Sequence, residues 1–454
     1  MSPRRLLPEW LPHQRWFGAK GRPIHDISIA ADRVLVDGDP SMRHLLVAVD
    51  LGEDTETYQM LVGSRTDLPQ RLEHAVIGAH GRRVLYDAAH DSELTHVLMQ
   101  MLAGAEDENG LRCRHLPGTE LETDLTSIVM GAEQSNTSIV FGDLYILKLF
   151  RKVAKGLNPD LEITRALHEA GSTAVVPPLA WLETDLDGEA TTLGMMQPFL
   201  KGASEGWALA VTSVRDLYAE ADLHADEVGG DFAGEAQRLG AATAEVHTAL
   251  AATLPTGRLE GKDLDDLVDG MRARLERTAA EVAELTPYAE ALRTAFDDLA
   301  ALDAPVEVQR VHGDYHLGQV MRTLDGWKLL DFEGEPARPL EERRAPDSPA
   351  KDVAGMLRSF DYAARHLLLD YRADAQREYR ATEWAERNRS AFCDGYAAAS
   401  GRDPRADGVL LRAFEIDKAV YEVLYEARNR PTWLAIPMSA IRRLAAVKDE
   451  ERAS

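Results

Sequence analysis

The sequence predicts an α+β protein in which strands dominate the first 200 residues and helices dominate the rest. Short runs of alternating apolar residues, separated by Asp/Gly turns, fill residues 10–100. Similar runs, interrupted by one amphipathic pattern, fill residues 123–200, and from Gly206 onward apolar residues recur at helical spacing. The chain is therefore expected to have three parts, at residues 1–100, 101–200 and 201–454.

The composition is that of a globular protein with room for more than one core. The chain has 454 residues, of which 45% are hydrophobic. Its net charge of −25, from 51 basic and 76 acidic side chains, disfavours nucleic acid and anionic membranes as partners. The two cysteines, Cys113 and Cys393, are too few for a cysteine-rich zinc site or a disulfide scaffold and suit the cytosol.

Neither a secretory signal nor a membrane span is expected. Met1–Arg5 is followed by Glu9, His13 and Arg15 instead of an apolar stretch. The longest apolar runs are far shorter than the roughly 20 residues that cross a bilayer. We therefore expect a cytoplasmic protein.

The first part has the pattern of a small sheet. Strands are expected at residues 27–36 and 43–51, with a turn at Asp37–Pro40 between them. Upstream, the Gly and Lys residues of Trp16–Gly21 would suit a phosphate-binding loop. No apolar strand precedes this segment, so an aromatic cluster that anchors the region is the preferred interpretation.

The second part combines strands with one helix. Strands are expected at residues 127–130, 138–141, 144–150 and 192–196. Gly142-Asp143 joins the second and third of these strands and is typical of a two-residue hairpin turn. Asn158–Asp160 then opens an amphipathic helix.

The third part is mainly helical. Residues 232–250 place apolar side chains on one face of a helix that Gly230-Asp231 opens. The lone helix histidines His168 and His247 are interpreted as having no function. Val306–Phe332 is the exception, because two short β-like stretches flank a turn rich in Gly, His and Asp. Further helices are expected at residues 263–284, 288–302, 352–369 and 413–428.

The strongest chemical signal lies in this exceptional segment. Val311–Gln319 contains His-Gly-Asp, and Trp327–Glu335 contains Asp-Phe-Glu after a short apolar strand. Phosphoryl transfer needs a group that orients the attacking hydroxyl and oxygen ligands for a metal that bridges the phosphates. Asp314 would accept the hydroxyl proton, while Gln319 and Asp331 would bind Mg²⁺. The alternative is a polar hairpin whose Asp and His side chains satisfy turn backbone groups.

A candidate lysine for the ATP phosphates precedes this segment. Lys148 lies in the apolar strand Tyr145–Phe150, and Glu162 follows in the next helix. A strand Lys paired with a helix Glu is the arrangement that aligns the α- and β-phosphates in kinases. The ordinary alternative is a Lys that extends from a strand end to solvent.

Two further segments would complete nucleotide binding. Ser135, Asn136 and Thr137 form a polar turn at the place of a glycine-rich phosphate loop, although the usual glycines are absent. Met196 and Gln197 end a strand at the place where an interlobe hinge would meet adenine. The sequence contains no Walker A motif, which disfavours a P-loop fold.

The order of phosphate turn, strand Lys, helix Glu, hinge, His-Gly-Asp loop and Asp-Phe-Glu resembles the aminoglycoside-phosphotransferase branch of the protein-kinase-like fold. Over nearly its whole length, the chain resembles the actinobacterial maltokinases. The resemblance implies a two-lobed α+β kinase fold, with an N-terminal strand-rich cap at 1–100, a nucleotide-binding N-lobe at 101–200 and a mostly helical C-lobe at 201–454. The matching stretches are 15–22, 131–138, 158–160, 206–207, 312–319, 331–336, 351–363 and 417–437.

The resemblance also implies ATP:maltose 1-phosphotransferase activity with Mg²⁺, feeding glycogen, α-glucan and trehalose metabolism. Trehalose synthase, which accompanies maltokinases in some bacteria, is an expected partner. Glucosamine kinases share much of the framework, so glucosamine or another sugar is the alternative acceptor. The alternative of another class is a kinase-like subunit without catalysis. Lys148, Asp314, Gln319 and Asp331 argue against it, because such a subunit does not need all four.

Supporting residues are assigned by the same resemblance. Glu333 replaces the Gly of Asp-Phe-Gly and would bind the metal or a metal-bound water. The alternative for Glu333 is a solvated hairpin carboxylate. His312 and Asp352 would support the catalytic loop, although an N-cap role for Asp352 is equally ordinary.

The sugar site is expected in the helical lobe. The resemblance points to Tyr421, Glu426 and Arg430, together with His316 and Arg358. Spacing alone favours a core tyrosine stripe beside an ordinary i,i+4 ion-pair ladder. Arg358 could face the sugar or pair with an acid elsewhere.

Overall fold

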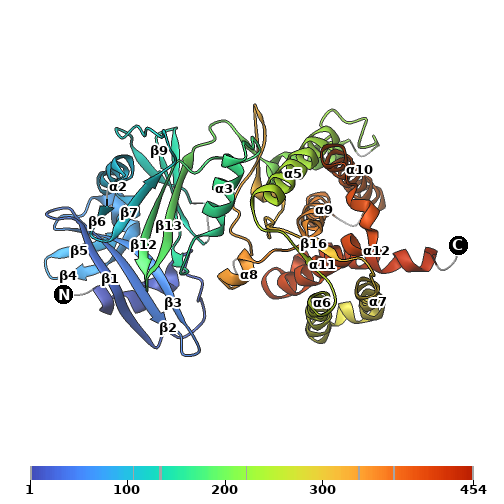
Figure 1. Cartoon of the computed structure of the whole chain (residues 1–454), viewed down its shortest axis with the longest axis horizontal. Coiled ribbons are helices and arrows are strands. Elements are labelled where there is room, and N and C mark those ends of the chain that lie inside the picture. Colours follow the sequence, from blue (N-terminus) through green and yellow to red (C-terminus); the bar gives the residue numbers. More distant parts are fainter. Residues whose placement is uncertain are drawn as a thin grey trace. The chain divides into compact units, whose positions relative to one another are not determined.

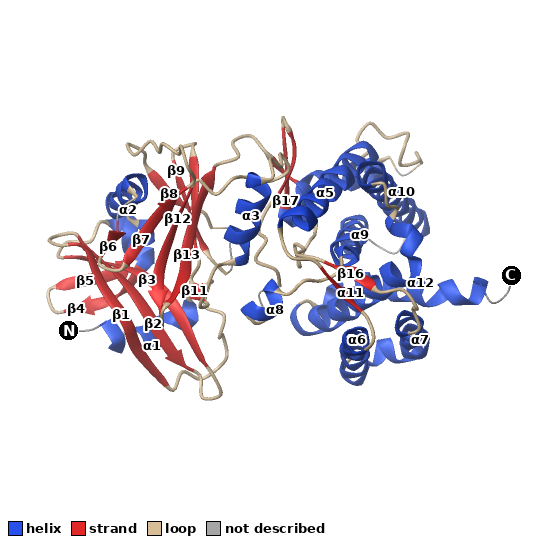
Figure 2. Ribbon diagram, in the orientation of Figure 1, coloured by secondary structure: helices blue, strands red, loops and turns tan. Residues whose placement is uncertain are grey.

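The computed structural model describes residues 3–105, 107–131, 135–220, 222–335, 338–371 and 374–451 (Figure 1). It divides the chain into two compact units. Strands predominate in unit 1 and helices in unit 2 (Figure 2), as the apolar patterns of the sequence predict. Unit 1 consists of Met1–Arg165 and Val176–Lys201, and unit 2 of Ala166–Val175 and Gly202–Ser454.

The first sheet of unit 1 has six antiparallel strands. Five of them follow the order β1-β2-β3-β5-β4, and β11 pairs with β3. The strands predicted at 27–36 and 43–51 are confirmed as β1 and β2. The bounds are β1 (Asp26–Val36), β2 (Ser41–Asp50), β3 (Thr55–Arg65), β4 (Val76–His80), β5 (Arg83–Asp87) and β11 (Lys152–Val153).

An aromatic cluster packs on this sheet. The ring centroids of Trp16 and Phe17 lie 5.9 and 5.1 Å from that of Tyr58 on β3, and Trp10 lies 5.8 Å from Trp16. Trp16 and Phe17 are buried. The anchoring role predicted for Trp16–Gly21 is therefore confirmed.

The second sheet of unit 1 has seven strands in the order β6-β7-β12-β13-β10-β9-β8. The two-residue hairpin prediction is wrong, because Phe141 pairs with Tyr145 and leaves the three residues Gly142–Leu144 in the loop. Gly142 has a φ of 55°, a conformation in which glycine meets no steric penalty. The bounds are β6 (Asp107–Glu108), β7 (Leu111–His115), β8 (Ser127–Val129), β9 (Thr137–Phe141), β10 (Tyr145–Leu149), β12 (Ala180–Leu186) and β13 (Glu189–Pro198).

Helix α2 (Ser92–Gly104) covers the core of unit 1. The Asp91 side chain caps its N-terminus by accepting a backbone hydrogen bond from two residues further on. Leu94, Leu98 and Leu102 recur every four residues, so they share the face that packs into the sheet core. Burial of each leucine contributes about 1.5–3 kcal/mol to folding.

Unit 2 is built mainly from helices. The ranges predicted as helical overlap α5, α6, α7, α9 and α11, whereas α4, α8, α10 and α12 fall in none of them. Within the described ranges, no helix combines the length and the apolar character needed to span a membrane. The bounds are α4 (Gly206–Ala219), α5 (Ala233–Thr253), α6 (Lys262–Glu281), α7 (Ala289–Ala300), α8 (Leu340–Arg344), α9 (Pro349–His366), α10 (Ala375–Ser400), α11 (Gly408–Asn429) and α12 (Ala435–Glu451).

Helices α5 and α10 lie side by side at backbone contact (Figure 1). A Cβ atom on Gly240 would lie 2.0 Å from the carbonyl oxygen of Phe392, and one on Gly395 would lie 1.9 Å from that of Gln237. These distances are shorter than any van der Waals contact. The crossing therefore requires glycine at both positions.

Two small antiparallel sheets frame the His-Gly-Asp segment. β15 pairs with β16, which ends just before this segment, and the order β14-β17-β18 forms the second sheet after it. The turn expected between two short β stretches is thus present. The bounds are β14 (Ser204–Glu205), β15 (Gly257–Leu259), β16 (Val306–Val308), β17 (Val320–Thr323) and β18 (Gly326–Leu329).

Candidate active site

The loop between β16 and β17 is fixed by one buried carboxylate. Asp352, in the first turn of α9, accepts hydrogen bonds from the backbone N–H groups of His312 (2.7 Å) and Gly313 (2.9 Å). His247 on α5 lies 3.0 Å from the same carboxylate and donates from Nε2. Burial opposes ionisation of Asp352, but His247 and the loop N–H groups hold its pKa below the usual value. Asp352 is therefore placed to support the loop, and His247, assigned no role from sequence, is part of that support.

Asp314 is the carboxylate that this loop presents. Its Oδ1 lies 3.2 Å from the Nζ of Lys418 on α11. Burial acts to raise the pKa of Asp314, but the positive charge of Lys418, with smaller contributions from His316 and His312, holds it below the usual value. Asp314 is therefore ionised at neutral pH, as a proton acceptor must be.

The two histidines of the loop brace its backbone. His312 is buried and donates from Nε2 to the carbonyl of Leu330 at 2.8 Å. His316 accepts a hydrogen bond from the backbone N–H of Gly318 at 3.0 Å, and burial lowers the pKa of its ring. Both side chains thus have structural partners next to Asp314.

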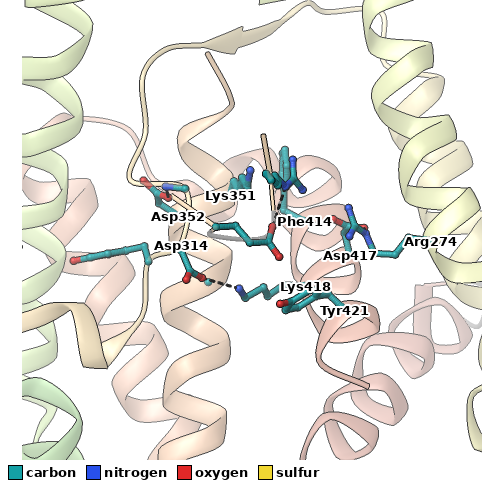
Figure 3. A pocket seen from close by; sticks show the side chains of 13 residues that line it. Arg274, Asp314, Lys351, Asp352, Phe414, Asp417, Lys418 and Tyr421 are labelled. Carbon is teal, nitrogen blue, oxygen red and sulfur yellow. Dashed lines mark hydrogen bonds and ion pairs between the residues drawn. The ribbon is translucent and has the colours of Figure 1, made fainter. Parts of the chain in front are cut away.

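Asp314 lines a pocket of unit 2 (Figure 3), whose empty volume of about 470 Å³ includes open solvent. Its lining contains four cationic and four carboxylate side chains. Three of these carboxylates form ion pairs with lining cations: Asp314 with Lys418 (3.2 Å), Asp417 with Arg274 (2.9 Å) and Glu335 with Arg338 (2.9 Å). The lining residues are Arg274, Gly313, Asp314, Tyr315, Glu335, Arg338, Lys351, Asp352, Gly355, Phe414, Asp417, Lys418 and Tyr421.

The three expected metal ligands lie at one end of the β17–β18 hairpin. The Leu330 N–H donates to the carbonyl of Gln319 at 2.9 Å, so Gln319 lies beside the residue that precedes Asp331. Asp331 has a φ of 62°, and its carboxylate has an oxygen within 4.8 Å of one from Glu333. An amide and two carboxylates are hard oxygen donors, which fit Mg²⁺. Arg343 lies 3.9 Å from the Glu333 carboxylate and balances part of its charge.

In unit 1, Lys148 lies on the inner strand β10, between Ser138 of β9 and Met195 of β13. Its Nζ lies 3.3 Å from the Asp160 carboxylate in the first turn of α3 (Pro159–Glu169). Glu162, the partner expected from sequence, follows two residues later in the same turn. The helix predicted after Asn158 is confirmed, and the carboxylate that it brings to the strand lysine is that of Asp160.

The expected phosphate turn is described in part. Residues 132–134 of the matching stretch lie outside the described residues. Ser135 is exposed, whereas Asn136 and Thr137 are buried. The Thr137 hydroxyl accepts a hydrogen bond from Nε of the buried Arg151 at 2.8 Å. The end of the turn is therefore tied to the sheet.

The expected hinge residues end strand β13. Met196 is buried and pairs with Leu147, while Gln197 pairs with Ile146. The Gln197 side chain donates to the carbonyl of Val176 at 2.8 Å. This contact fixes the strand end at which the adenine contact was predicted.

The structure corrects the assignment of Arg358 to substrate. Arg358 is fully buried on α9 and donates to Glu422 (2.6 Å) and Asp361 (2.6 Å). The two carboxylates hold its pKa above the usual value despite burial. Of the two roles considered for Arg358, pairing with acids is the one observed, and Arg358 is not among the pocket-lining residues.

The remaining sugar candidates separate into two groups. Tyr421 lines the pocket and stacks on Tyr425 at a centroid distance of 6.3 Å. Glu426 is buried and pairs with Arg430 at 2.6 Å, and it accepts a hydrogen bond from Tyr362. Neither Glu426 nor Arg430 is among the pocket-lining residues. Glu426 and Arg430 therefore form an ordinary i,i+4 ion pair, while Tyr421 stays a candidate for sugar binding.

Of the α11 residues that line the pocket, the sequence had indicated only Tyr421. Phe414, Asp417, Lys418 and Tyr421 recur at i, i+3, i+4 and i+7 on α11, so they share one helix face. That spacing, combined with the Tyr421 candidate, could have identified Asp417 and Lys418. Their partners on distant segments carry no comparable local signal.

Comparison with known proteins matches two stretches of the chain to family models. Residues 10–91 match the maltokinase N-terminal cap domain, and residues 125–388 match the phosphotransferase enzyme family. A glucosamine kinase of Streptacidiphilus jiangxiensis is 30% identical over 318 residues, which cover 67% of this chain and 70% of that protein. A glucosamine kinase of Mycolicibacterium smegmatis is 29% identical over 335 residues, which cover 70% of this chain and 78% of that protein.

Solved structures agree on the fold. A glucosamine kinase in complex with glucosamine, ADP and inorganic phosphate superposes with a TM-score of 0.71 and 22% identity, covering 98% of this chain and 99% of that one. A glucosamine kinase in crystal form B gives a TM-score of 0.74 at 23% identity, covering 98% of this chain and 99% of that one. From these matches and the His-Gly-Asp loop, we conclude that the chain belongs to the phosphotransferase enzyme family, with the α+β kinase-like fold and a maltokinase-type N-terminal cap.

Proposed function

We propose that this sugar kinase is an ATP:maltose 1-phosphotransferase, which converts ATP and maltose to ADP and maltose 1-phosphate. The family supplies the kinase chemistry, and the N-terminal cap supports the maltokinase branch. The expected links to trehalose synthase and to glycogen and trehalose metabolism belong to the same proposal and follow from the maltokinase resemblance.

The observation that carries the choice of acceptor is the charge balance of the pocket. A protonated amino sugar needs a carboxylate that is not already neutralised, because its ammonium loses hydration on binding. Lining carboxylates Asp314, Asp417 and Glu335 are each ion-paired with a lining cation. A neutral polyol needs no such charge, and it can stack on the aromatic face of Tyr421. The pocket therefore suits maltose better than glucosamine.

The residues of unit 2 would perform the transfer. Asp314 would orient the anomeric hydroxyl and accept its proton as the hydroxyl oxygen attacks the γ-phosphorus of ATP. His312 and Asp352 would keep the loop in place through their backbone contacts. Gln319, Asp331 and Glu333 would hold Mg²⁺, which supplies positive charge to the phosphate oxygens.

The residues of unit 1 would bind the nucleotide. Lys148 would pair with phosphate oxygens, and the Asp160 carboxylate of α3 would keep its side chain in position. The turn from Ser135 to Thr137 would contact the phosphates through hydroxyl and amide groups. Met196 and Gln197 would offer backbone groups to adenine.

Glucosamine kinase is the second candidate. The curated relatives and the full-length structural matches carry that name, which favours it independently of the pocket. Close relatives of one fold often differ in acceptor, because acceptor choice depends on a few pocket side chains. A direct comparison of the two sugars therefore decides between them.

The test is ATP consumption by the purified protein with a panel of sugars, followed by ³¹P NMR of the product. We expect kcat/KM for maltose to exceed that for glucosamine by well over about tenfold, or about 1.4 kcal/mol of discrimination. Phosphate should appear at the anomeric position. Asp314→Asn serves as the control, and it should lose turnover while retaining ATP affinity.

Two outcomes would contradict the proposal. A preference for glucosamine would keep the kinase and replace its acceptor. Failure of the wild-type protein to phosphorylate any sugar, with nucleotide binding intact, would favour the non-catalytic subunit.

A further inference from the structure

Lys418 enters the pocket from α11, one helical turn before Tyr421 (Figure 3). Its Nζ lies 3.2 Å from Asp314 Oδ1 and 5.2 Å from the centroid of the Tyr421 ring. The side chains of Lys418 and Asp314 are 29% and 25% exposed, so water screens this pair less than a surface ion pair. Lys418 is therefore a direct neighbour of both the proposed proton acceptor and the proposed sugar platform.

The charged surroundings keep this pair ionised. Burial acts to lower the pKa of Lys418, but the carboxylates of Asp314, Glu422 and Glu335 hold it above the usual value. On the other side, His316 and His312 face Asp314 from its own loop. Because the pKa shifts of Lys418 and Asp314 are opposite, the ion pair persists through the neutral pH range.

The loop backbone has its own supports. Asp352 binds the N–H groups of His312 and Gly313, and the hydroxyl of Ser359 accepts from the N–H of Leu317 at 3.0 Å. None of these contacts involves α11. Lys418 therefore acts on the side chain of Asp314 and not on the fold of the loop.

We propose that Lys418 is a positioning residue, which holds the Asp314 carboxylate by Oδ1 so that the other oxygen meets the acceptor hydroxyl. Without this ion pair, rotation about the Asp314 side chain would direct its oxygens away from the reacting hydroxyl for part of the time. Loss of near-attack geometry lowers kcat more than it weakens substrate binding. The inference rests on the proposed role of Asp314, but it holds for any acceptor sugar.

The first readout is a split between kcat and KM. Lys418→Met should lower kcat by about 30-fold or more, within the range of acid–base effects, and should change the KM for ATP less than about threefold. Lys418→Arg retains the charge and should recover kcat to within about fivefold of wild type. A role in packing alone would not respond to the return of charge in this way.

The second readout is the pH profile. Lys418 lowers the pKa of Asp314, so its removal leaves burial to raise that pKa. The acid limb of kcat/KM, which reports the free enzyme, should then move to higher pH by about one unit in Lys418→Met and stay near its wild-type position in Lys418→Arg.

Arg428→Met is the matched control. It removes another ion pair of α11, between Arg428 and Glu281 at 2.6 Å on the surface, and it should leave kcat and the acid limb unchanged. Thermal melting of every variant excludes unfolding as the cause.

A Lys418→Met protein that melts like wild type, retains kcat within about threefold and keeps the acid limb would overturn the inference. Failure of the proposed function looks different, because it shows in the wild-type sugar panel. If the wild type uses another sugar, the Lys418 variants are measured with that sugar.

Discussion

At the scale of single residues, the position of Asp331 requires both a carboxylate side chain and a left-handed backbone conformation. Its φ of 62° lies in the left-handed region, which Asn, Asp and Gly enter more readily than other residues. The same turn presents its carboxylate near that of Glu333. A substitution at Asp331 would therefore remove a proposed Mg²⁺ ligand and, depending on the new residue, would also strain the backbone.

This double role predicts that Asp331→Asn and Asp331→Ala differ in stability but agree in metal binding. Both should lose Mg²⁺-dependent ATP binding, because the cation loses an anionic ligand. Asn tolerates the left-handed conformation, so only the Ala variant should lose about 1–2 kcal/mol of stability. Calorimetric titration with Mg-ATP and urea denaturation measure the two effects.

Glu333→Ala is the companion variant. It should weaken Mg-ATP binding less than Asp331→Asn if Glu333 acts through a metal-bound water. Normal Mg-ATP binding by Asp331→Asn would remove Asp331 from the ligand set.

At the scale of elements, the contact between α5 and α10 depends on two glycines. Gly240 and Gly395 each face a carbonyl oxygen of the opposite helix, so neither accommodates a side chain. The crossing lies in unit 2, where α5 also supplies His247 to the carboxylate that fixes the His-Gly-Asp loop. If the helices separated, His247 would move away from Asp352, and the loop that Asp352 binds would lose part of its support.

We predict that Gly395→Ala destabilises the protein by about 2–3 kcal/mol, because its Cβ would overlap a backbone oxygen that cannot move alone. Gly270→Ala is the matched control. Gly270 lies on the exposed face of α6 with nothing within 4 Å of an added Cβ, so alanine there should stabilise by about 1 kcal/mol through helix propensity. Urea denaturation should show a lower free energy of unfolding for Gly395→Ala and a higher one for Gly270→Ala. Changes of the same sign in both variants would contradict the packing argument.

Local elements were the part of the fold that the sequence could predict. Alternation identified β1 and β2, and helical spacing identified α5 and α11, because these patterns depend on near neighbours alone. The hairpin after Phe141 was misjudged by one residue, since the pairing register rather than the Gly-Asp dipeptide sets the loop length.

At the scale of the whole molecule, the site was predictable where its residues are close in sequence. The His-Gly-Asp loop and Asp331 flank the β17–β18 hairpin, so their order in the sequence indicated them as candidates. Lys418 meets Asp314 across 104 residues and Arg358 meets Glu422 across 64, and no local pattern predicts such pairings. Helix spacing could therefore place Lys418 beside Tyr421, but only the structure shows that Lys418 pairs with Asp314 and Arg358 with Glu422.

The net charge of the chain and the balanced charge of its pocket have a consequence for encounter kinetics. With −25 overall, the protein attracts cations over long distances at low salt, whereas a neutral sugar experiences no such steering. At saturating Mg-ATP, kcat/KM for maltose should stay constant within about 1.5-fold between 20 and 300 mM salt, because screening has no charge on the acceptor to act upon. The protonated amino sugar should instead lose kcat/KM as salt rises. A steep salt dependence with maltose would mean that acceptor capture is coupled to a charged step of the enzyme.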